Sequence, residues 1–418
     1  MTPLSRRTLR DDLLTRCFAG AGQEVHRSQR IGVEVELIPL DSLTGRRCPL
    51  EHEAMVSTLP FVRRYGSGQG WCEGSTAKGT PCFQLPGGGA ITFEPGGQLE
   101  YSSPPFRSAA QLLHNLRAVV LPLCSAASGE GIHLLASGID PLNSIDEAPL
   151  LLRAKRYDRM ARYLATRGPA GAQMMRQTAS MQVNVDFPRE SWRGWRVLNA
   201  ASPYITAIFA NSPMYQGQPT GYQSVRAAVW RAVDPARTGL PYDEPDPVES
   251  YLDFALCAPA ILLSTGPDEY PSFGEWMTHG GASLEEWHDH LTTLFPEVRP
   301  REHLELRSID SLPAEWYAAP FALITGILYD AGSLYSADDL LGEPDPSMLD
   351  QAGQSGLHDS SLARTARDLF EIGLRGCRAL GSTYFDPADL EQASTFFDRF
   401  TRRGRSPADD VLESAIAA

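Results

Sequence analysis

The chain has 418 residues and a formal net charge of −14, from 51 acidic and 37 basic side chains, and this surplus argues against nonspecific binding to nucleic acid. No run of 18 apolar residues occurs that would span a membrane, and the charged stretch from Met1 to Gly20 lacks the apolar core of a signal peptide. Seven scattered cysteines favour a reducing compartment over a disulfide scaffold, so we expect a soluble cytoplasmic protein.

The first expected elements are a helix from Thr2 to Phe18 and a strand over residues 31–37. Side chains alternate along a strand, so Glu34 and Glu36 share one face and the apolar residues take the other. The glycines between residues 66 and 89 then predict a long irregular region, either a loop over a ligand or plain disorder.

Two cysteines lie in this glycine-rich region, at Cys72 and Cys82. They are close enough in sequence to pair, but we expect free thiols.

A second strand is expected from Phe93 to Glu100, with a bend or bulge at Pro95 and the two glycines after it. If the segment stays extended, one face carries Glu94, Gln98 and Glu100.

The middle of the chain predicts a helix over residues 106–128, a strand over 131–137 and a helix over 149–166 with a basic exposed side. The third carboxylate- and amide-bearing strand, residues 178–187, has the cleanest alternation. Its polar face carries Thr178, Ser180, Gln182, Asn184 and Asp186.

Helices are expected on either side of the turn at residues 211–213, and a loop over 234–247. A fourth strand, residues 303–309, places Glu305 and Arg307 on one face. Beyond Leu312 the chain is predicted to be mainly helical, with an amphipathic helix over residues 362–377.

Strands and helices do not alternate as repeated βαβ units would, so we predict an α+β fold with an antiparallel sheet flanked by helices. The candidate site residues run from Glu34 to Arg307, so one sheet must collect them. We therefore expect a single catalytic domain over residues 1–418, with the active-site sheet in 31–310 and a mainly helical part in 312–418.

Five glutamates on one face of a sheet predict bound cations. Carboxylates two residues apart on a strand lie roughly 7 Å from each other, and such a pair repels by about 2 kcal/mol at an effective dielectric near 20. An oxygen-only ligand set favours Mg²⁺ or Mn²⁺ over zinc. For any one strand, the alternative is a half-buried sheet with an ordinary wet face.

Other common site motifs are absent from the sequence. It contains no Walker-type phosphate loop, no dinucleotide-binding glycine spacing, no Gly-x-Ser-x-Gly turn and no His-Glu-x-x-His zinc motif. His288 and His290 would point about 200° apart on a helix, so we interpret them as part of a solvated face.

Four blocks of residues resemble the plant-type and actinobacterial glutamate-cysteine ligases. They are residues 32–36, residues 93–105, residues 174–186 and residues 303–307, and their order and spacing match over roughly residues 31–310, about two thirds of the chain. The segments 211–213, 226–230 and 234–239 also resemble this family, most of all its branch in ergothioneine or mycothiol-type thiol metabolism.

The resemblance implies an ATP-dependent carboxylate-amine ligase with a curved antiparallel sheet related to the glutamine synthetase catalytic domain. In that family ATP phosphorylates the γ-carboxylate of L-glutamate, and the amine of L-cysteine attacks the acyl phosphate to give γ-glutamylcysteine. Phosphoryl transfer needs chiefly metal ions, positive charge and alignment, which fits a glutamate-rich sheet without a phosphate loop.

By motif, the resemblance implies that five glutamates bind Mg²⁺ or Mn²⁺: Glu34, Glu36, Glu94, Glu100 and Glu305. Arg307 would steady the transferred phosphoryl group or a substrate carboxylate, or else only neutralise Glu305. Gln182 and Asn184 would orient substrate or a metal-bound water, with structural hydrogen bonding as the alternative. Arg226 would pair with the α-carboxylate of glutamate, unless it is a surface arginine at a helix start, and Thr178 lies with the substrate-binding residues.

Two departures concern the amine acceptor. Ser103 stands where the plant sequences suggest glycine, and the region from Gly66 to Gly89 is longer than expected. A different amine acceptor is therefore an open alternative, as are a divalent-metal hydrolase that activates water with the same carboxylates and a noncatalytic binding protein. The sequence does not reveal the oligomeric state.

Overall fold

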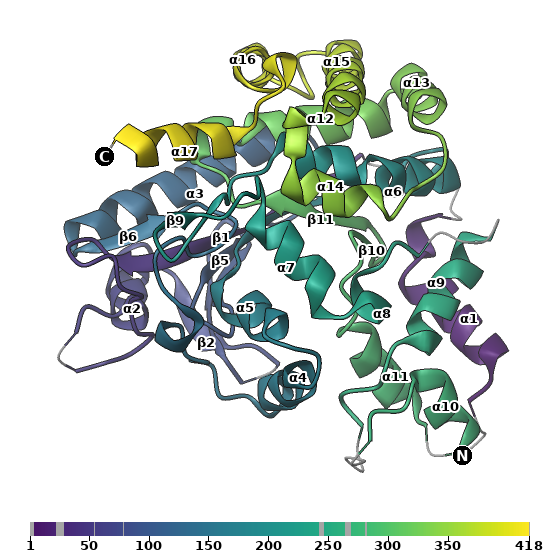
Figure 1. Ribbon diagram of the computed structural model, residues 1–418, viewed down its shortest axis with the longest axis horizontal. Coiled ribbons are helices and arrows are strands. Elements are labelled where there is room, and N and C mark those ends of the chain that lie inside the picture. The colour runs from purple at the N-terminus through teal and green to yellow at the C-terminus, as the bar shows by residue number, and fades with distance from the viewer. Residues whose placement is uncertain are drawn as a thin grey trace.

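The computed structural model of the protein describes residues 4–21, 29–53, 55–77, 79–241, 246–263, 269–280 and 282–417 (Figure 1). Of the expected opening helix, Thr2 and Pro3 lie outside these ranges. Within them, no helix is long and apolar enough to cross a membrane.

One antiparallel sheet of nine strands runs through the described part of the chain. Its hydrogen-bonded order is β10-β11-β7-β1-β5-β4-β3-β2, and β6 pairs with the far half of β1. The strands are β1 (Ile31–Asp41), β2 (Cys72–Ser75), β3 (Pro81–Gln84), β4 (Ala90–Phe93), β5 (Leu99–Ser102), β6 (Ile132–Leu135), β7 (Ser180–Val185), β10 (Val298–Pro300) and β11 (Leu304–Asp310). A separate hairpin is formed by β8 (Met214–Tyr215) and β9 (Gln218–Pro219).

The predicted glutamate-bearing segments are neighbours in this sheet. Strand β1 lies between β5 and β7, with Glu36 opposite Glu100 and Glu34 opposite Gln182. Strand β11 follows on the other side of β7, where Glu305 lies opposite Asn184. The alternation predicted for β1 is confirmed, because Glu34 and Glu36 line a cavity on one face whereas Val33, Val35 and Leu37 join the hydrophobic core on the other.

Helices cover the sheet and form most of the C-terminal third, as predicted (Figure 1). They are α1 (Arg6–Arg16), α2 (Thr58–Gly68), α3 (Ala109–Gly129), α4 (Lys155–Ala165), α5 (Ala170–Gln177), α6 (Ser191–Ile208), α7 (Val225–Val233), α8 (Pro235–Thr238), α9 (Pro247–Cys257), α10 (Phe273–Thr278), α11 (Leu284–Leu291), α12 (Ala318–Tyr329), α13 (Ala331–Leu341), α14 (Met348–Gln354), α15 (Ser360–Leu380), α16 (Pro387–Arg399) and α17 (Pro407–Ala417). The α+β class with an antiparallel sheet is therefore confirmed.

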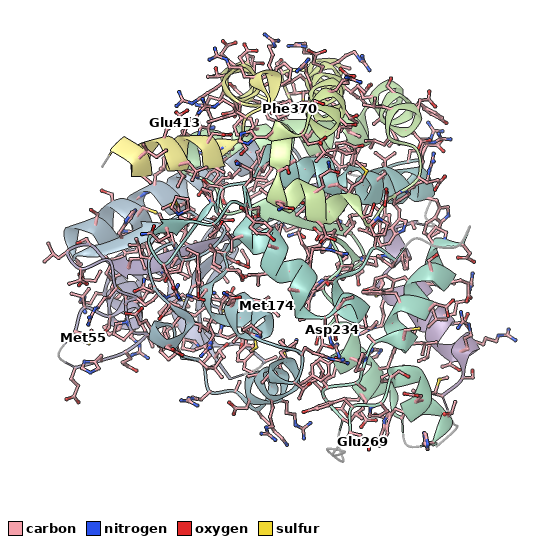
Figure 2. All side chains as sticks on the ribbon, viewed as in Figure 1. Met55, Met174, Asp234, Glu269, Phe370 and Glu413 are labelled. Carbon is pink, nitrogen blue, oxygen red and sulfur yellow. The ribbon has the colours of Figure 1, made fainter. Side chains whose placement is uncertain are left out.

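The C-terminal helices pack around α12, whose twelve residues are all buried. Phe370 of α15, labelled in Figure 2, stacks on Phe396 of α16 with ring centroids 6.0 Å apart. Gly326 of α12 meets Gly373 of α15 so closely that a Cβ at Gly326 would lie 1.9 Å from the Gly373 carbonyl oxygen. Because every residue of α12 is buried, this helix lies at the centre of the group.

The prediction of an irregular glycine-rich region is wrong. Within the described residues 58–77 and 79–93, the chain forms α2 and the strand meander β2-β3-β4. Glycines lie in the turns that connect these elements. Gly70, Gly79 and Gly88 have φ of 73°, 77° and 83°, a backbone conformation that other residues rarely adopt. Cys72 and Cys82 are free thiols on β2 and β3, as expected.

Two other local predictions need correction. His290 on α11 is not on a solvated face; it is 2% exposed, its Nε2 lies 2.7 Å from the Ala255 carbonyl oxygen, and burial lowers its pKa to about 3. The expected loop from Asp234 to Pro247 contains α8, and residues 242–245 of it lie outside the described ranges.

Candidate active site

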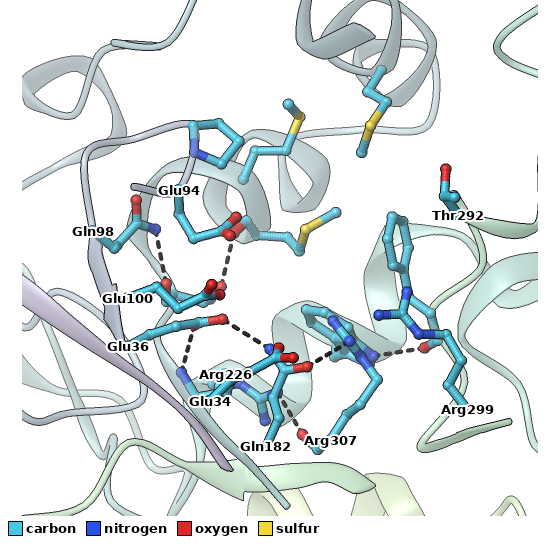
Figure 3. Close-up of a pocket in the computed structure, with 18 of the residues that line it drawn as sticks. Glu34, Glu36, Glu94, Gln98, Glu100, Gln182, Arg226, Thr292, Arg299 and Arg307 are labelled. Carbon is cyan, nitrogen blue, oxygen red and sulfur yellow. Dashed lines mark hydrogen bonds between the residues drawn. The ribbon is translucent and has the colours of Figure 1, made fainter. Parts of the chain in front are cut away.

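A cavity of about 270 Å³ lies over the polar face of the sheet, bounded by β1, β5, β7, β10 and β11 and by α4, α5 and α7. Figure 3 shows 18 of the residues that line it. The full lining is Glu34, Glu36, Glu94, Pro95, Gln98, Glu100, Arg156, Tyr157, Met160, Met174, Met175, Thr178, Ser180, Gln182, Arg226, Trp230, Thr292, Phe295, Arg299, Arg301 and Arg307.

Three glutamates on one side of the cavity form a compact group, called here the carboxylate wall: Glu36, Glu94 and Glu100. One carboxylate oxygen from each lies within 4.8 Å of the others. Glu36 and Glu100 are opposite each other on β1 and β5, whereas Glu94 belongs to the turn that joins β4 to β5. Such an oxygen set suits a hard divalent cation.

The segment from Phe93 to Glu100 is a tight hairpin rather than one bent strand. The Glu94 N–H donates to the Gln98 carbonyl oxygen at 2.8 Å, and the Gly97 N–H donates to the Glu94 carbonyl oxygen at 2.7 Å. Gly97 has a φ of 82°, which closes the turn. Glu94, Gln98 and Glu100 reach the same cavity because the chain folds back, and not because they share one strand face.

Neighbouring polar groups orient the carboxylate wall. The Ser180 N–H donates to Glu36 Oε2 at 2.7 Å, and Gln182 Nε2 donates to Glu36 Oε1 at 3.0 Å. The hydroxyls of Thr92 and Ser102 donate to Glu100 Oε1 at 2.8 and 3.0 Å. In each case these hydrogen bonds engage only part of the acceptor capacity of the carboxylate.

Burial and mutual repulsion shift the glutamates on β1. Burial raises the pKa of Glu34 to about 8, and the nearby charges of Glu305 and Glu100 raise it further. Burial, followed by the charge of Glu100, raises the pKa of Glu36 to about 7. Without a cation both groups hold a proton for part of the neutral pH range, and a bound cation would displace it.

Four arginines that line the cavity form what is called here the arginine wall: Arg226, Arg299, Arg301 and Arg307. Figure 3 shows Arg226, Arg299 and Arg307 on the side away from Glu94. Glu305 does not line the cavity itself, but it pairs with three of the four arginines. Arg299 Nη2 donates to its two oxygens at 2.7 and 3.0 Å, Arg301 Nη1 donates to Oε2 at 3.0 Å, and Arg307 Nη1 also pairs with it.

Glu305 is fully buried and lies outside the group of three glutamates that approach one another. Burial alone would raise its pKa, but the charges of Arg299, Arg307 and Arg301 outweigh burial and hold the pKa well below the usual range. Both of its oxygens accept from arginines, so Glu305 holds the arginine wall in place in this structure. The suggestion that Arg307 pairs with Glu305 holds, but Arg307 also faces the cavity.

Arg226 is 3% exposed and lines the cavity, so it is not a surface arginine. Its Nη2 donates to the Arg307 carbonyl oxygen at 2.6 Å, and its guanidinium lies 5.1 Å from the centre of the Trp230 ring. Asp310 is 3.8 Å from Arg226 Nη1 and also accepts from the hydroxyls of Ser212 and Ser224 at 2.6 and 2.9 Å. The segment 211–213 and the start of α7 therefore hold Arg226 against β11.

Gln182 joins the two walls. Its Nε2 donates to Glu36, and its Oε1 accepts from Arg307 Nη1 at 2.7 Å (Figure 3). Thr178 also lines the cavity, with its hydroxyl donating to the Met174 carbonyl oxygen at 2.8 Å. The amide of Gln182 is therefore already engaged on both sides, and it fixes the relative position of a carboxylate and an arginine.

Asn184 lies away from this cavity and lines a second one, of about 390 Å³, at the other end of β7. Its Oδ1 is 3.2 Å from His303 Nε2. Glu34 and Arg301 line both cavities. The structure thus brings together nine of the ten predicted site residues in or directly beneath the first cavity and separates Asn184 from them.

Sequence reasoning missed Arg156, Arg299 and Arg301. Arg156 on α4 donates from Nη1 and Nη2 to the hydroxyl and carbonyl oxygens of Thr292, at 2.6 and 2.9 Å. Arg299 and Arg301 stand two residues apart around Pro300, and this spacing places them on one face of an extended segment. That spacing was the available signal, but β10 has only three residues and shows no longer alternation.

Comparison with known proteins identifies the class to which this fold and site belong. The sequence model of glutamate-cysteine ligase family 2 matches residues 30–416, so the chain belongs to this family. It is 38% identical over 351 residues to glutamate-cysteine ligase EgtA of Mycolicibacterium smegmatis, a match that covers 80% of this chain and 79% of the relative. It is 29% identical over 439 residues to the chloroplastic glutamate-cysteine ligase of Nicotiana tabacum, covering 97% of this chain and 79% of the relative.

A solved structure shares the fold. The crystal structure of glutamate-cysteine ligase from Francisella tularensis in complex with AMP superimposes with a TM-score of 0.55 at 14% identity, covering 93% of this chain and 84% of that one.

Proposed function

We propose that this protein is an ATP-dependent ligase that joins the γ-carboxyl group of L-glutamate to the amine of L-cysteine and forms γ-glutamylcysteine, ADP and phosphate. Membership of the glutamate-cysteine ligase family supports the proposal, as does its similarity to the glutamate-cysteine ligases of Mycolicibacterium smegmatis and Nicotiana tabacum. The AMP in the Francisella tularensis structure supports an adenine nucleotide as a substrate of the shared fold.

The observation that carries the proposal is the pairing of a carboxylate wall with an arginine wall across one cavity (Figure 3). Transfer of a phosphoryl group from ATP to a carboxylate brings two anions into contact, so the site must supply positive charge on more than one side. Glu36, Glu94 and Glu100 would hold Mg²⁺ or Mn²⁺, with Glu34 beside them. When bound, the cation would offset charge on the phosphates.

The chain's own residues bind and align the reactants. An oxygen of the glutamate γ-carboxylate attacks the terminal phosphorus of ATP and ADP leaves. The neutral amine of cysteine then attacks the acyl carbon, phosphate leaves with the carboxylate oxygen, and the nitrogen releases a proton as the amide forms. Arg307, which lines the cavity, would contact the transferred phosphoryl group, and Arg226, whose guanidinium is buried and fixed, would pair with the α-carboxylate of glutamate. Gln182 keeps Arg307 and Glu36 in register.

Apart from Arg156, the part of the cavity around α4 and α5 is mainly apolar, and it would receive the acceptor side chain. It is lined by Tyr157, Met160, Met174, Met175 and Phe295. A small side chain such as that of cysteine suits a recess of this kind, since methionines adapt to soft, compact groups. A different small amine remains the second candidate, because nothing in this recess is specific to a thiol.

Three further parts belong to the proposal. The family resemblance implies a curved sheet of the glutamine synthetase type and Mg²⁺ or Mn²⁺ as the cation, and the scattered cysteines favour a cytoplasmic location. The oxygen-only ligand group is consistent with the choice of cation.

The test is ADP formation with components omitted one at a time and the product identified by mass spectrometry. ADP should appear only when ATP, L-glutamate, a divalent cation and an amine are all present, and the product should have the mass of γ-glutamylcysteine. Glu94→Gln should abolish turnover, whereas Glu315→Gln, an exposed position outside the cavity, should not. A panel of amines identifies the acceptor, and turnover without ATP would favour a hydrolase instead.

A further inference from the structure

The turn that carries Glu94 and Gln98 is held from several directions by groups outside the cavity. The N–H groups of Leu151 and Leu152 donate to the Pro95 carbonyl oxygen at 2.8 and 3.1 Å. Gly96 lies so close to α5 that a Cβ there would be 2.3 Å from the Arg176 carbonyl oxygen. The turn is therefore pressed against the C-terminal end of α5 with no room for a side chain.

One guanidinium bridges the two backbones at this contact. Arg47 Nη2 donates to the Gly96 carbonyl oxygen at 2.6 Å and to the Arg176 carbonyl oxygen at 3.2 Å. Arg47 is 8% exposed and does not line the cavity. Arg47 lies just after the turn that follows β1 and forms an antiparallel β-bridge with Leu40 of that strand. It therefore belongs to the same continuous segment as Glu34 and Glu36.

The charge of Arg47 is balanced by Asp140, whose Oδ2 lies 3.8 Å from Arg47 Nη1. Asp140 is itself fully buried, and its Oδ1 accepts from the backbone N–H groups of Leu142 and Asn143 at 3.0 and 3.1 Å. A buried charge is costly unless it is paired and hydrogen-bonded. This pair is placed where the extension of β1, the β4–β5 turn and the end of α5 meet.

We propose that Arg47 is a positioning residue for the carboxylate wall, acting through the Gly96 carbonyl to fix Glu94 at the distance from Glu36 and Glu100 that a divalent cation requires. This role rests on the proposed function. The three segments that Arg47 joins lead directly to the wall: β1 carries Glu36, the turn carries Glu94, and α5 leads into β7 at Ser180. Lysine cannot replace it, because an ammonium on a flexible stem lacks the rigid planar fork of arginine.

The test measures cation binding directly, without substrates. Purified wild-type protein and Arg47→Lys are titrated with Mn²⁺, and free Mn²⁺ is followed by electron paramagnetic resonance. Loss of a group that orients a metal ligand typically weakens metal affinity by about 10- to 100-fold, so Arg47→Lys should bind Mn²⁺ at least about tenfold more weakly. In turnover, excess Mn²⁺ should restore kcat, because the ligands themselves remain.

Arg237→Lys is the matched control. Arg237 is also fully buried and donates to backbone carbonyls, those of Thr293 and Pro259, but it does not contact the β4–β5 turn. It should lose thermal stability with little change in Mn²⁺ affinity. Gly96→Ala perturbs the same turn without changing a charge, and it should weaken Mn²⁺ binding as Arg47→Lys does, which keeps the test informative if one variant folds poorly.

The outcomes separate this inference from the proposed function. If wild-type protein binds Mn²⁺ and both turn variants bind it equally well, the positioning role is wrong and the proposed function stands. If wild-type protein binds no divalent cation at all, the proposed carboxylate site is wrong, and the role of Arg47 falls with it.

Discussion

Replacing Glu305 by glutamine distinguishes an anchor of the arginine wall from a cation ligand. The side chain is fully buried, and its two oxygens accept from Arg299, Arg301 and Arg307. Glutamine keeps the shape but removes the negative charge, which leaves three guanidinium groups without their common partner. Breaking a buried ion pair by removing one charge typically costs about 3–5 kcal/mol, so we expect a loss of this size.

The assay is urea unfolding of wild-type protein and Glu305→Gln, with Mn²⁺ titration of the folded variant. We predict a large loss of stability, loss of ligase turnover and retained Mn²⁺ binding, because the carboxylate wall is not altered. Glu297→Gln is the matched control. Glu297 is 6% exposed and accepts from the Ser308 hydroxyl at 2.6 Å, so its change should cost only about 1 kcal/mol.

Either of two results would show that Glu305 does not act as an anchor of the arginine wall alone. If Glu305→Gln is as stable as Glu297→Gln, the three arginines do not depend on it. If it is stable but no longer binds Mn²⁺, Glu305 is a cation ligand after all.

Three further predictions test other parts of the account. The pKa values of Glu34 and Glu36 are raised to about 8 and about 7 in the folded protein, whereas an unfolded chain loses these protons near pH 4. The stabilisation that these two groups contribute is therefore complete below about pH 4 and is lost as the pH rises to about 8. Urea unfolding in the presence of a chelator should show the free energy of unfolding falling with pH, and added Mn²⁺ should reduce that fall. A free energy of unfolding that does not change with pH would count against both pKa shifts. Arg226→Lys should lower kcat/KM by about tenfold or more, since it loses charge-assisted hydrogen bonds worth about 1.5–3 kcal/mol; unchanged kinetics would remove Arg226 from the substrate site. Gly326→Ala should lower thermal stability by about 1–3 kcal/mol through its clash with Gly373 but leave Mn²⁺ affinity unchanged, and a stable variant would mean that α12 and α15 can separate at little cost.

Much of the site could be predicted because strand alternation is a local property of the sequence. The period of two places Glu34 and Glu36 on one face without any knowledge of their neighbours. On two other strands it places Gln182 on the face of Ser180, and Arg307 on the face of Glu305. Strand alternation does not show that the four segments are neighbours in one sheet. The family resemblance implied that they are. Their register in the sheet, with Glu36 opposite Glu100, came only from the structure.

The partners of each charge could not be predicted, because they come from segments with weak local patterns. Glu305 was expected to bind a cation, but two of its three arginines lie in or next to the short strand β10, around a proline. His290 was expected in solvent because only its angle to His288 was considered. Its ring stacks on Phe273 of α10, with centroids 4.8 Å apart, a contact between two helices that periodicity does not reveal.

The most direct test of the central claim follows an oxygen atom. L-Glutamate labelled with ¹⁸O in its γ-carboxyl group is incubated with the protein, ATP, Mg²⁺ and L-cysteine, and the released phosphate is analysed by mass spectrometry. If the two walls bring ATP and the γ-carboxylate together for phosphoryl transfer, each turnover moves one labelled oxygen into phosphate. Release of unlabelled phosphate, with γ-glutamylcysteine still forming, would contradict an acyl-phosphate intermediate and the role assigned to the paired walls.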